Sequence, residues 1–277
     1  MAKKAKEKSK EKDQGEKAGG CDSTTLYNNY VQVCQSIGIE PYNDLKHITT
    51  TTGEQIIITG TTERKLSCGC RALMNALTGG KLAGGGGNLE PFTSLKDLRI
   101  RSSNIRRSLE VGMNKTITSL SLDFNPFGSK GTATLCKGLA TNSCLKVLSL
   151  KHCGIDSMGG DHIASMLTFK RLALTTLDLS SNSIQGLGLN RLCNGLEKNT
   201  SLTTLRLADN NVRQSDEDLA ALEMFGQVLL THSKLTTIDL NHNYIGSKGG
   251  KLLLPGVSEN NQITTFKISE IGIDEQT

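Results

Sequence analysis

The sequence predicts an α/β solenoid, with a curved parallel sheet on the concave side and helices on the convex side. The main observation is a stretch that recurs as LTTLDLSSNSI at 174–184, LTTLRLADNNV at 202–212 and LTTIDLNHNYI at 235–245. Its apolar positions persist while the residues between them change charge, which is typical of stacked structural repeats. Aromatic residues make up only 4% of the 277 residues, so we expect a core of aliphatic side chains shared between repeats.

Seven repeat units can be counted when the first apolar position of this stretch is taken as slot one. Slot one is occupied by Leu95, Ile117, Leu145, Leu174, Leu202, Leu235 and Ile263. The steps between them are 22, 28, 29, 28, 33 and 28 residues, and slots four and six are apolar in every unit. We therefore expect one short strand per unit, whose apolar side chains stack on the equivalent side chains of neighbouring units.

Slot nine is Asn in four units and Cys153 in another. A buried amide must be hydrogen-bonded, so we expect each of these Asn side chains to bind the backbone of adjacent turns. A Cys at this slot can pack there with a weaker hydrogen-bonding demand. After the turn, apolar residues follow at helical spacing, which predicts one helix per unit. The four asparagines are Asn125, Asn182, Asn210 and Asn243.

The chain divides into three parts, at 1–22, 23–94 and 95–277. The first part is rich in Lys and Glu and is predicted to be disordered when alone. The second part reads as a helix that Pro41 stops, a strand in GEQIIITGT, a helix in RKLSCGCRALMNAL and a Gly-rich insertion, TGGKLAGGGGN. We interpret it as an N-terminal capping repeat, and the third part as the repeat domain.

Charge and cysteine content narrow the class of protein. The formal net charge is +5, of which the first twenty residues contribute +3. The remainder is nearly balanced, which disfavours a dedicated nucleic-acid surface. The eight Cys have irregular spacings, which is typical of reduced packing residues in the cytoplasm. We also expect no signal peptide and no membrane span, because no sufficiently long apolar run occurs.

The 28- and 29-residue units, with Asn or Cys at slot nine, also carry a glycine at slot fifteen. These glycines are Gly131, Gly159, Gly188 and Gly249. In these features 95–277 resembles, and 50–94 more weakly resembles, the long leucine-rich repeats of the ribonuclease-inhibitor-like class. That class includes ribonuclease inhibitor, Ran GTPase-activating proteins and the sensing regions of NOD-like receptors. The resemblance implies an intracellular protein that binds other proteins.

A narrower resemblance lies in the N-terminal part. Tyr30 and Cys34 at helical spacing, followed by Gly38 and Pro41 before the first strand, are similar to the pattern of small leucine-rich-repeat proteins from ciliary axonemes. This similarity implies a structural component of a multi-subunit axonemal assembly in a cilium or flagellum. Two alternatives stay open: a GTPase-activating protein of the Ran type, and nucleic-acid binding through the lysine-rich tail.

In a solenoid of this kind, the residues between the ladder leucines face the concave side. Threonines recur at slots two and three, and we interpret them as a cross-strand ladder that favours the sheet. Slots five, seven and eight vary between units and are the predicted contacts with a partner protein. The predicted contact residues are Arg99, Arg101, Asp123, Phe124, Lys151, His152, Asp178, Arg206, Asp209, Asp239 and His242. Phe124 is either an interface anchor or a side chain packed on its neighbouring turn.

Catalytic and metal chemistry find little support. Cys68 and Cys70 form a C-x-C pair without further ligands at zinc spacing. The run GGKLAGGGG contains Gly-Lys without the following Ser or Thr of a phosphate-binding loop. No nucleophile, base and orienting residue converge. We therefore expect a non-catalytic protein with no metal and no cofactor.

Overall fold

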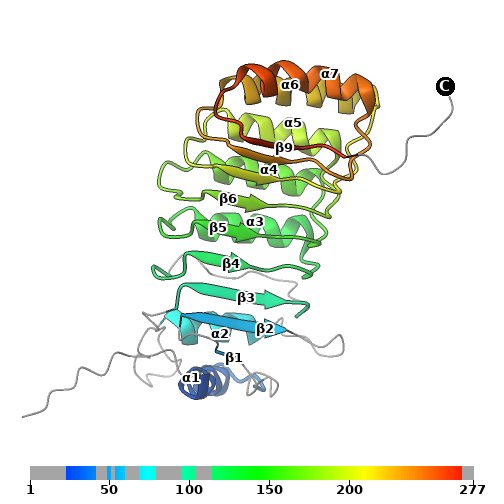
Figure 1. The fold of residues 1–277 in the computed structure, drawn as a ribbon. Helices are drawn as coiled ribbons and strands as arrows, with labels where there is room; N and C mark the ends of the chain where they lie inside the picture. The colour runs from blue at the N-terminus through cyan, green and yellow to red at the C-terminus, as the bar shows by residue number, and fades with distance from the viewer. Residues whose placement is uncertain are drawn as a thin grey trace, which may run out of the picture.

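The structure, a computed structural model, describes residues 23–41, 49–50, 54–59, 69–78, 95–103 and 114–269. Within these residues, nine strands form one sheet in chain order from β1 to β9. Strands β2 to β9 are parallel, and β1 pairs with β2 in the antiparallel direction. The helices lie together on one face of this sheet (Figure 1). The predicted solenoid of strands and helices is thus confirmed.

Each described unit from the fourth strand to the eighth strand contains a short strand followed by a helix. The strands are β1 (Thr49–Thr50), β2 (Gln55–Thr59), β3 (Asp97–Arg101), β4 (Ser119–Ser121), β5 (Val147–Ser149), β6 (Thr176–Asp178), β7 (Thr204–Arg206), β8 (Thr237–Asp239) and β9 (Thr265–Lys267). The helices are α1 (Ser23–Ser36), α2 (Gly69–Thr78), α3 (Gly128–Leu139), α4 (Ser157–Leu167), α5 (Gln185–Leu196), α6 (Asp216–Thr231) and α7 (Gly246–Glu259).

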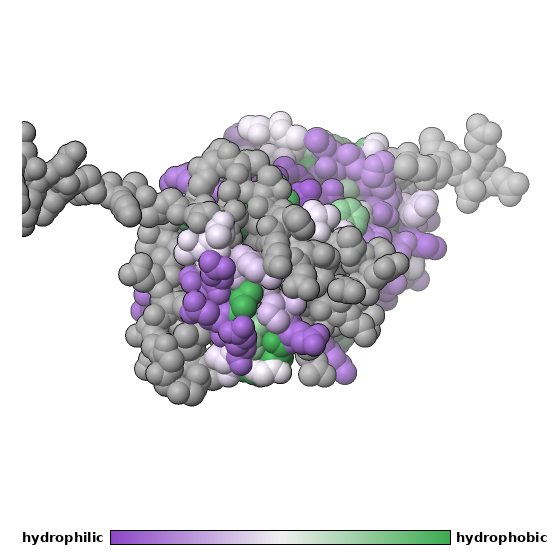
Figure 2. Space-filling view, turned by 90° about the horizontal axis from the view of Figure 1, so that it is seen from below, coloured by the Kyte–Doolittle hydropathy of each residue, from purple (hydrophilic) through white to green (hydrophobic). Residues whose placement is uncertain are grey.

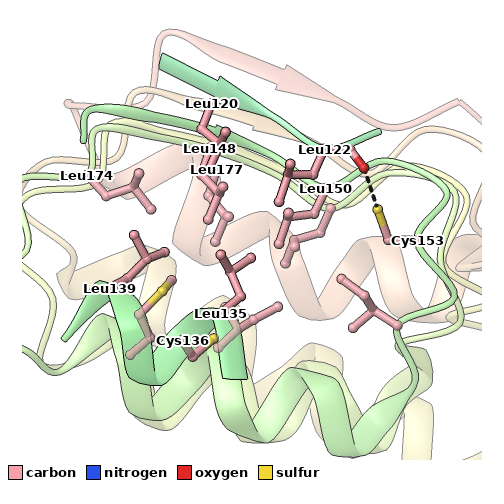
Figure 3. Packing of buried hydrophobic residues seen from close by; sticks show 14 of the residues in the cluster. Leu120, Leu122, Leu135, Cys136, Leu139, Leu148, Leu150, Cys153, Leu174 and Leu177 are labelled. Carbon is pink, nitrogen blue, oxygen red and sulfur yellow. Dashed lines mark hydrogen bonds between the residues drawn. The ribbon is translucent and has the colours of Figure 1, made fainter. Parts of the chain in front are cut away.

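The slot-four side chains pair directly across the sheet. Leu120 is in register with Leu148, which is in register with Leu177, which is in register with Leu205. All four are fully buried, and burial of a leucine contributes about 1.5–3 kcal/mol. Figure 3 shows Leu120, Leu148 and Leu177 in one row, with side chains of α3 facing them from below. The predicted aliphatic ladder is therefore the core of the solenoid.

The predicted role of the slot-nine asparagines is confirmed. The Asn182 Oδ1 accepts hydrogen bonds from the backbone N–H groups of Cys153 and Ile155 in the preceding unit. Its Nδ2 donates to the carbonyl oxygens of Leu150, Leu179 and Ser180. Each such side chain links its own turn to the turn before it, so backbone groups that water cannot reach are satisfied.

Cys153 takes the same slot with fewer hydrogen bonds. Its Sγ donates to the carbonyl oxygens of Leu122 and Lys151, at 3.3 and 3.4 Å, and the first of these bonds is drawn in Figure 3. Burial raises the pKa of the Cys153 thiol to about 12. Cys136 and Cys193 are also buried and free. These three cysteines are packing residues, as the sequence predicts.

The slot-fifteen glycines make room for the side chain one helical turn earlier. A Cβ atom on Gly159 would lie 2.4 Å from Cγ2 of Ile155. The equivalent distance at Gly249, to Cγ2 of Ile245, is also 2.4 Å. Because real Cβ atoms do not approach so closely, any larger residue must displace the slot-eleven side chain from the core.

A second row of asparagines joins the helices to the strands. Three residues before slot one, Asn199 accepts hydrogen bonds at Oδ1 from the N–H groups of Ser201 and Leu202. Its Nδ2 donates to the Leu167 carbonyl of the preceding unit. Asn142 makes the same kinds of bonds in its own turn. This row was not predicted from the sequence.

His232 replaces asparagine in the unit of β8. Its Nδ1 accepts hydrogen bonds from the N–H groups of Lys234 and Leu235, at 3.2 and 3.1 Å. The side chain is buried, and Nε2 has no hydrogen-bond partner in the described part of the chain. Burial lowers the pKa of His232, because the charged imidazolium would lose its solvation there.

The N-terminal helix covers one end of the stack. α1 lies beside α2 and buries Leu26, Tyr30 and Cys34. It ends at Ser36, before the predicted stop at Pro41, and Gly38 follows in the left-handed region with φ 70°. Seen from this end, the described side chains are mainly hydrophilic around a few apolar ones (Figure 2). The predicted tail, the Gly-rich insertion and Cys68 lie outside the described residues.

Candidate functional site

Each strand from β3 to β8 is followed by a slot-eight residue in the left-handed region. These residues are Ser102, Phe124, His152, Ser181, Asp209 and His242, with φ between 50° and 61°. Such a backbone is strained for a residue other than glycine. A hydrogen bond offsets the strain: the Phe124 N–H donates to the Lys151 carbonyl at 2.8 Å, and the other five bond in the same way. The turns thus carry a row of side chains along the strand ends.

Phe124, which the sequence predicts as a contact residue on the concave side, lies in this row at the end of its strand. It is 50% exposed, and its ring lies 5.4 Å from the ring of His152, with an angle of 38° between the planes. The two rings come from neighbouring units, and half of the Phe124 surface stays exposed beside this contact. An exposed ring held in this way can bury its free face against a partner.

The charged residues near β3 and β4 pair with one another. The Arg99 guanidinium contacts the Asp97 carboxylate at 2.8 Å, and Arg101 lies 3.8 Å from Asp123. Burial alone would raise the pKa of Asp97, but hydrogen bonds from Arg99, Gln55 and Ser119 lower it below its usual value. The charges of Arg99 and Arg101 are therefore partly neutralised within the chain.

The structure corrects the prediction that Asp123 contacts a partner protein. It is only 4% exposed, because its carboxylate turns back onto the sheet. It accepts hydrogen bonds from the Ser121 and Ser149 hydroxyls and from the Lys151 N–H, at 2.9, 2.6 and 3.0 Å. Asp123 therefore supports Arg101 and the Lys151 backbone, and its side chain is not available for a direct contact.

A row of alternating charges crosses the C-terminal half of the sheet at slot five. Asp178 is in register with Arg206, Arg206 with Asp239, and Asp239 with Lys267. Arg206 lies 3.9 Å from the Asp178 carboxylate, which is largely buried. Opposite charges on adjacent strands favour this pairing of the sheet. The row is thus partly structural, and Arg206 and Asp239 stay accessible.

A hollow of about 640 Å³ lies over this row. It brings together six of the eleven predicted residues, namely Lys151, Asp178, Arg206, Asp209, Asp239 and His242. Arg99, Arg101, Asp123, Phe124 and His152 lie outside it. The hollow therefore combines three carboxylates with two cations, a mixed charge pattern that suits recognition of a macromolecular surface.

Tyr244 also lines the hollow and was not among the residues predicted from the sequence. It occupies slot ten, is 46% exposed, and has the Arg213 guanidinium 5.5 Å from its ring centroid. Slot ten is small or polar in the preceding units, at Gly154, Ser183 and Asn211. An aromatic residue at this slot departs from the pattern, and this departure is the sequence signal that could have identified Tyr244.

Among the described residues, no group of three or more His, Cys, Asp or Glu is placed to hold a metal ion. None of the helices in the described part of the chain has the length and apolar character needed to cross a membrane.

Comparisons with known proteins identify the repeat. The protein-family model described as Leucine Rich repeat matches 114–136, 141–164, 173–193, 198–222 and 231–254. Ribonuclease inhibitor of Sus scrofa is 33% identical over 182 residues, which cover 62% of this chain and 38% of that protein. NACHT, LRR and PYD domains-containing protein 12 of Mus musculus is 36% identical over 151 residues, which cover 54% of this chain and 14% of that protein.

A solved structure of Leiomodin-1 Actin-Binding Site 2 has a TM-score of 0.45 and 20% identity to this chain. It covers 55% of this chain, and the match covers 87% of that structure. The chain spans well under half the length of each of these two curated relatives, ribonuclease inhibitor and NACHT, LRR and PYD domains-containing protein 12.

Proposed function

Because the chain is an α/β leucine-rich repeat solenoid similar to ribonuclease inhibitor, we propose that it is a non-catalytic scaffold that binds another protein. The contact surface consists of the charged hollow over β6 to β8 together with the Phe124 and His152 rings beside it. The observation that carries the proposal is the Phe124 ring, which stays 50% exposed while it contacts the His152 ring.

The two parts of this surface have different physical roles. The mixed charges of the hollow orient a partner and set its association rate more than its affinity. Phe124 contributes affinity, because burial of its remaining exposed ring is worth about 1–2 kcal/mol at 25 cal/mol per Å² of apolar area. A partner that spans both parts gains orientation and affinity together.

The direct test is capture of the native partner with cross-linking, followed by measurement of its affinity for variants of the full chain. Phe124→Ala is expected to weaken binding about tenfold with the fold intact. Met158→Ala is the matched control, since Met158 is 49% exposed but lies on α4. Equal affinity of the Phe124→Ala variant and the unmodified chain would remove Phe124 from the interface.

The setting that we propose is the cytoplasm, within a multi-subunit axonemal assembly such as a radial spoke of a cilium or flagellum. Support comes from the N-terminal pattern, in which Tyr30 and Cys34 share the buried side of α1 and Gly38 ends the helix region. Fractionation of ciliated cells tests this setting. The chain should stay with axonemes after detergent removes the membrane, and complete release into the soluble fraction would contradict it.

The rate of GTP hydrolysis by Ran, measured with and without this chain, distinguishes the scaffold from a Ran-type GTPase-activating protein. A scaffold leaves the rate of GTP hydrolysis by Ran unchanged. Acceleration that depends on Arg206, the accessible arginine of the hollow, would replace the scaffold proposal with that enzyme-regulating activity.

A further inference from the structure

The turns that lead from each helix to the next strand carry an excess of positive charge. They lie together along one rim of the solenoid, at the left of Figure 1. We call this the basic rim and define it as 114–119, 139–147, 167–176, 196–204, 231–237 and 259–265. Its charged residues are the cations Lys115, Lys146, Lys170, Arg171, Lys198 and Lys234 and the acids Glu197 and Glu259, a balance of +4.

The opposite rim, where strands lead into helices, has the opposite sign. Over 121–128, 149–157, 178–185, 206–216 and 239–246 it carries three cations and six acids, a balance of −3. The cations are Lys151, Arg206 and Arg213, and the acids are Asp123, Asp156, Asp178, Asp209, Asp216 and Asp239. The two rims of one sheet therefore present different electrostatic potentials to an approaching molecule.

The six cations of the basic rim are exposed. No ion pair or side-chain hydrogen bond engages them among the described residues, whereas Lys96 in the preceding unit pairs with Glu54 at 2.7 Å. Favourable interaction with a helix C-terminus falls off within the last turn. That interaction can account for Lys198, two residues after the end of α5. Lys146, however, stands immediately before β5, and Lys234 and Lys115 stand three and four residues before β8 and β4. The fold itself thus leaves most of these charges without a structural role.

We propose that the basic rim is a second interaction surface, separate from the hollow, and that it binds an extended acidic segment of a protein. Five of the six cations are Lys, whose ammonium groups attract carboxylates and phosphates alike. The described turns of the rim present one aromatic residue, Phe169, and its ring packs against the core. Single-stranded nucleic acid would need exposed rings on which to stack, so carboxylates are the better complement.

The spacing of the units fits such a segment. Neighbouring strands are about 4.8 Å apart and neighbouring helices about 8–10 Å apart. The rim turns join these two layers, so their spacing lies between the two values. Alternate side chains of an extended segment are about 6.6 Å apart. A segment that runs along the rim, with acidic residues at alternate positions, therefore places about one carboxylate at each unit.

The test uses the full chain and a fluorescent peptide of about twelve residues, alternating Glu and Ser, which is long enough to follow the rim. Binding is measured by fluorescence anisotropy at low and at moderate salt. The rim variant carries Lys146→Glu, Lys170→Glu and Lys198→Glu. The control variant carries Lys130→Glu, Lys248→Glu and Lys251→Glu, which change the net charge equally at exposed sites of α3 and α7.

The dissociation constant of the peptide should rise at least about tenfold in the rim variant and change by less than about twofold in the control variant. Circular dichroism of both variants should match the unmodified chain, because none of the substituted side chains is buried. Both variants keep the lysine-rich residues 1–22, so any binding there cancels in the comparison.

Four outcomes would overturn the proposal. The first is no binding of the peptide at low salt, and the second is equal weakening in both variants, which would reflect net charge alone. The third is tighter binding of a single-stranded DNA of equal length, which would make the rim a nucleic-acid surface. The fourth is a self-associating chain that the rim variant converts to a monomer in sedimentation, with no effect on the peptide, which would assign the rim to a second copy.

Discussion

Replacement of Asn182 by Ala removes a side chain that makes five hydrogen bonds to the backbone. The carbonyls of Leu179 and Ser180 keep other donors, Asn210 and His152. Three buried groups lose their only partners in the described part of the chain: the N–H groups of Cys153 and Ile155 and the carbonyl of Leu150. An unsatisfied buried group costs about 1–3 kcal/mol. We therefore expect the free energy of unfolding to fall by about 3 kcal/mol or more.

Urea unfolding followed by circular dichroism measures this change. Asn194→Ala is the matched control, because Asn194 is exposed on α5 and alanine is the better helix former. The control should be neutral or slightly stabilising. A loss below about 1 kcal/mol for Asn182→Ala, with an unchanged slope of the transition, would refute the view that slot nine holds adjacent turns together.

Four further substitutions test other parts of the structure by urea unfolding. Leu177→Ala should cost about 2–5 kcal/mol as a truncation in the ladder, and a cost below about 0.5 kcal/mol would contradict its core position. Gly159→Ala should destabilise because of the clash described above, whereas Gly250→Ala, whose Cβ would meet nothing within 4 Å, should stabilise α7 by up to about 1 kcal/mol. Burial lowers the pKa of His232 from 6.5, so the native state binds its proton less readily than the unfolded state. Above about pH 6.5, protonation of His232 should not reduce the free energy of unfolding. Between pH 6.5 and the lowered pKa, the free energy of unfolding should fall by at most about 1.4 kcal/mol per pH unit. His232→Asn should lose less stability between pH 7 and pH 5.5 than the unmodified chain; an equal loss would show that His232 does not contribute.

The ladder, the strand order and the slot-nine bonds could be predicted because they follow from a period that the sequence repeats. Leu177 is apolar in a slot that is apolar in every unit, and Asn182 must be satisfied wherever it is buried. Periodicity alone could not predict that the Asp123 carboxylate is buried. Its slot points to the concave side, but two neighbouring serines and the Lys151 N–H draw its carboxylate back onto the sheet.

Residues that depart from the repeat were harder to interpret. His232 stands where four other units have Asn, and only the structure shows that its Nδ1 replaces the amide oxygen while Nε2 stays unpaired. The basic rim was also not predicted, because its cations are spread over several positions of the repeat, and only Lys170 and Lys198 share one. These cations come close together only because the fold stacks the turns side by side.

The way Asn182 reaches back one turn and no further has a consequence for how such a protein changes length. Each coil of the chain recognises the coil before it by contacts that are nearly identical from one coil to the next. A duplicated copy of 174–201, inserted after position 201, would make nearly the same contacts with the coils on either side of it. Lengthening the molecule by whole coils is therefore an easy step for evolution or for an engineer, whereas inserting half a coil would leave the asparagines at the junction without their partners in the preceding turn.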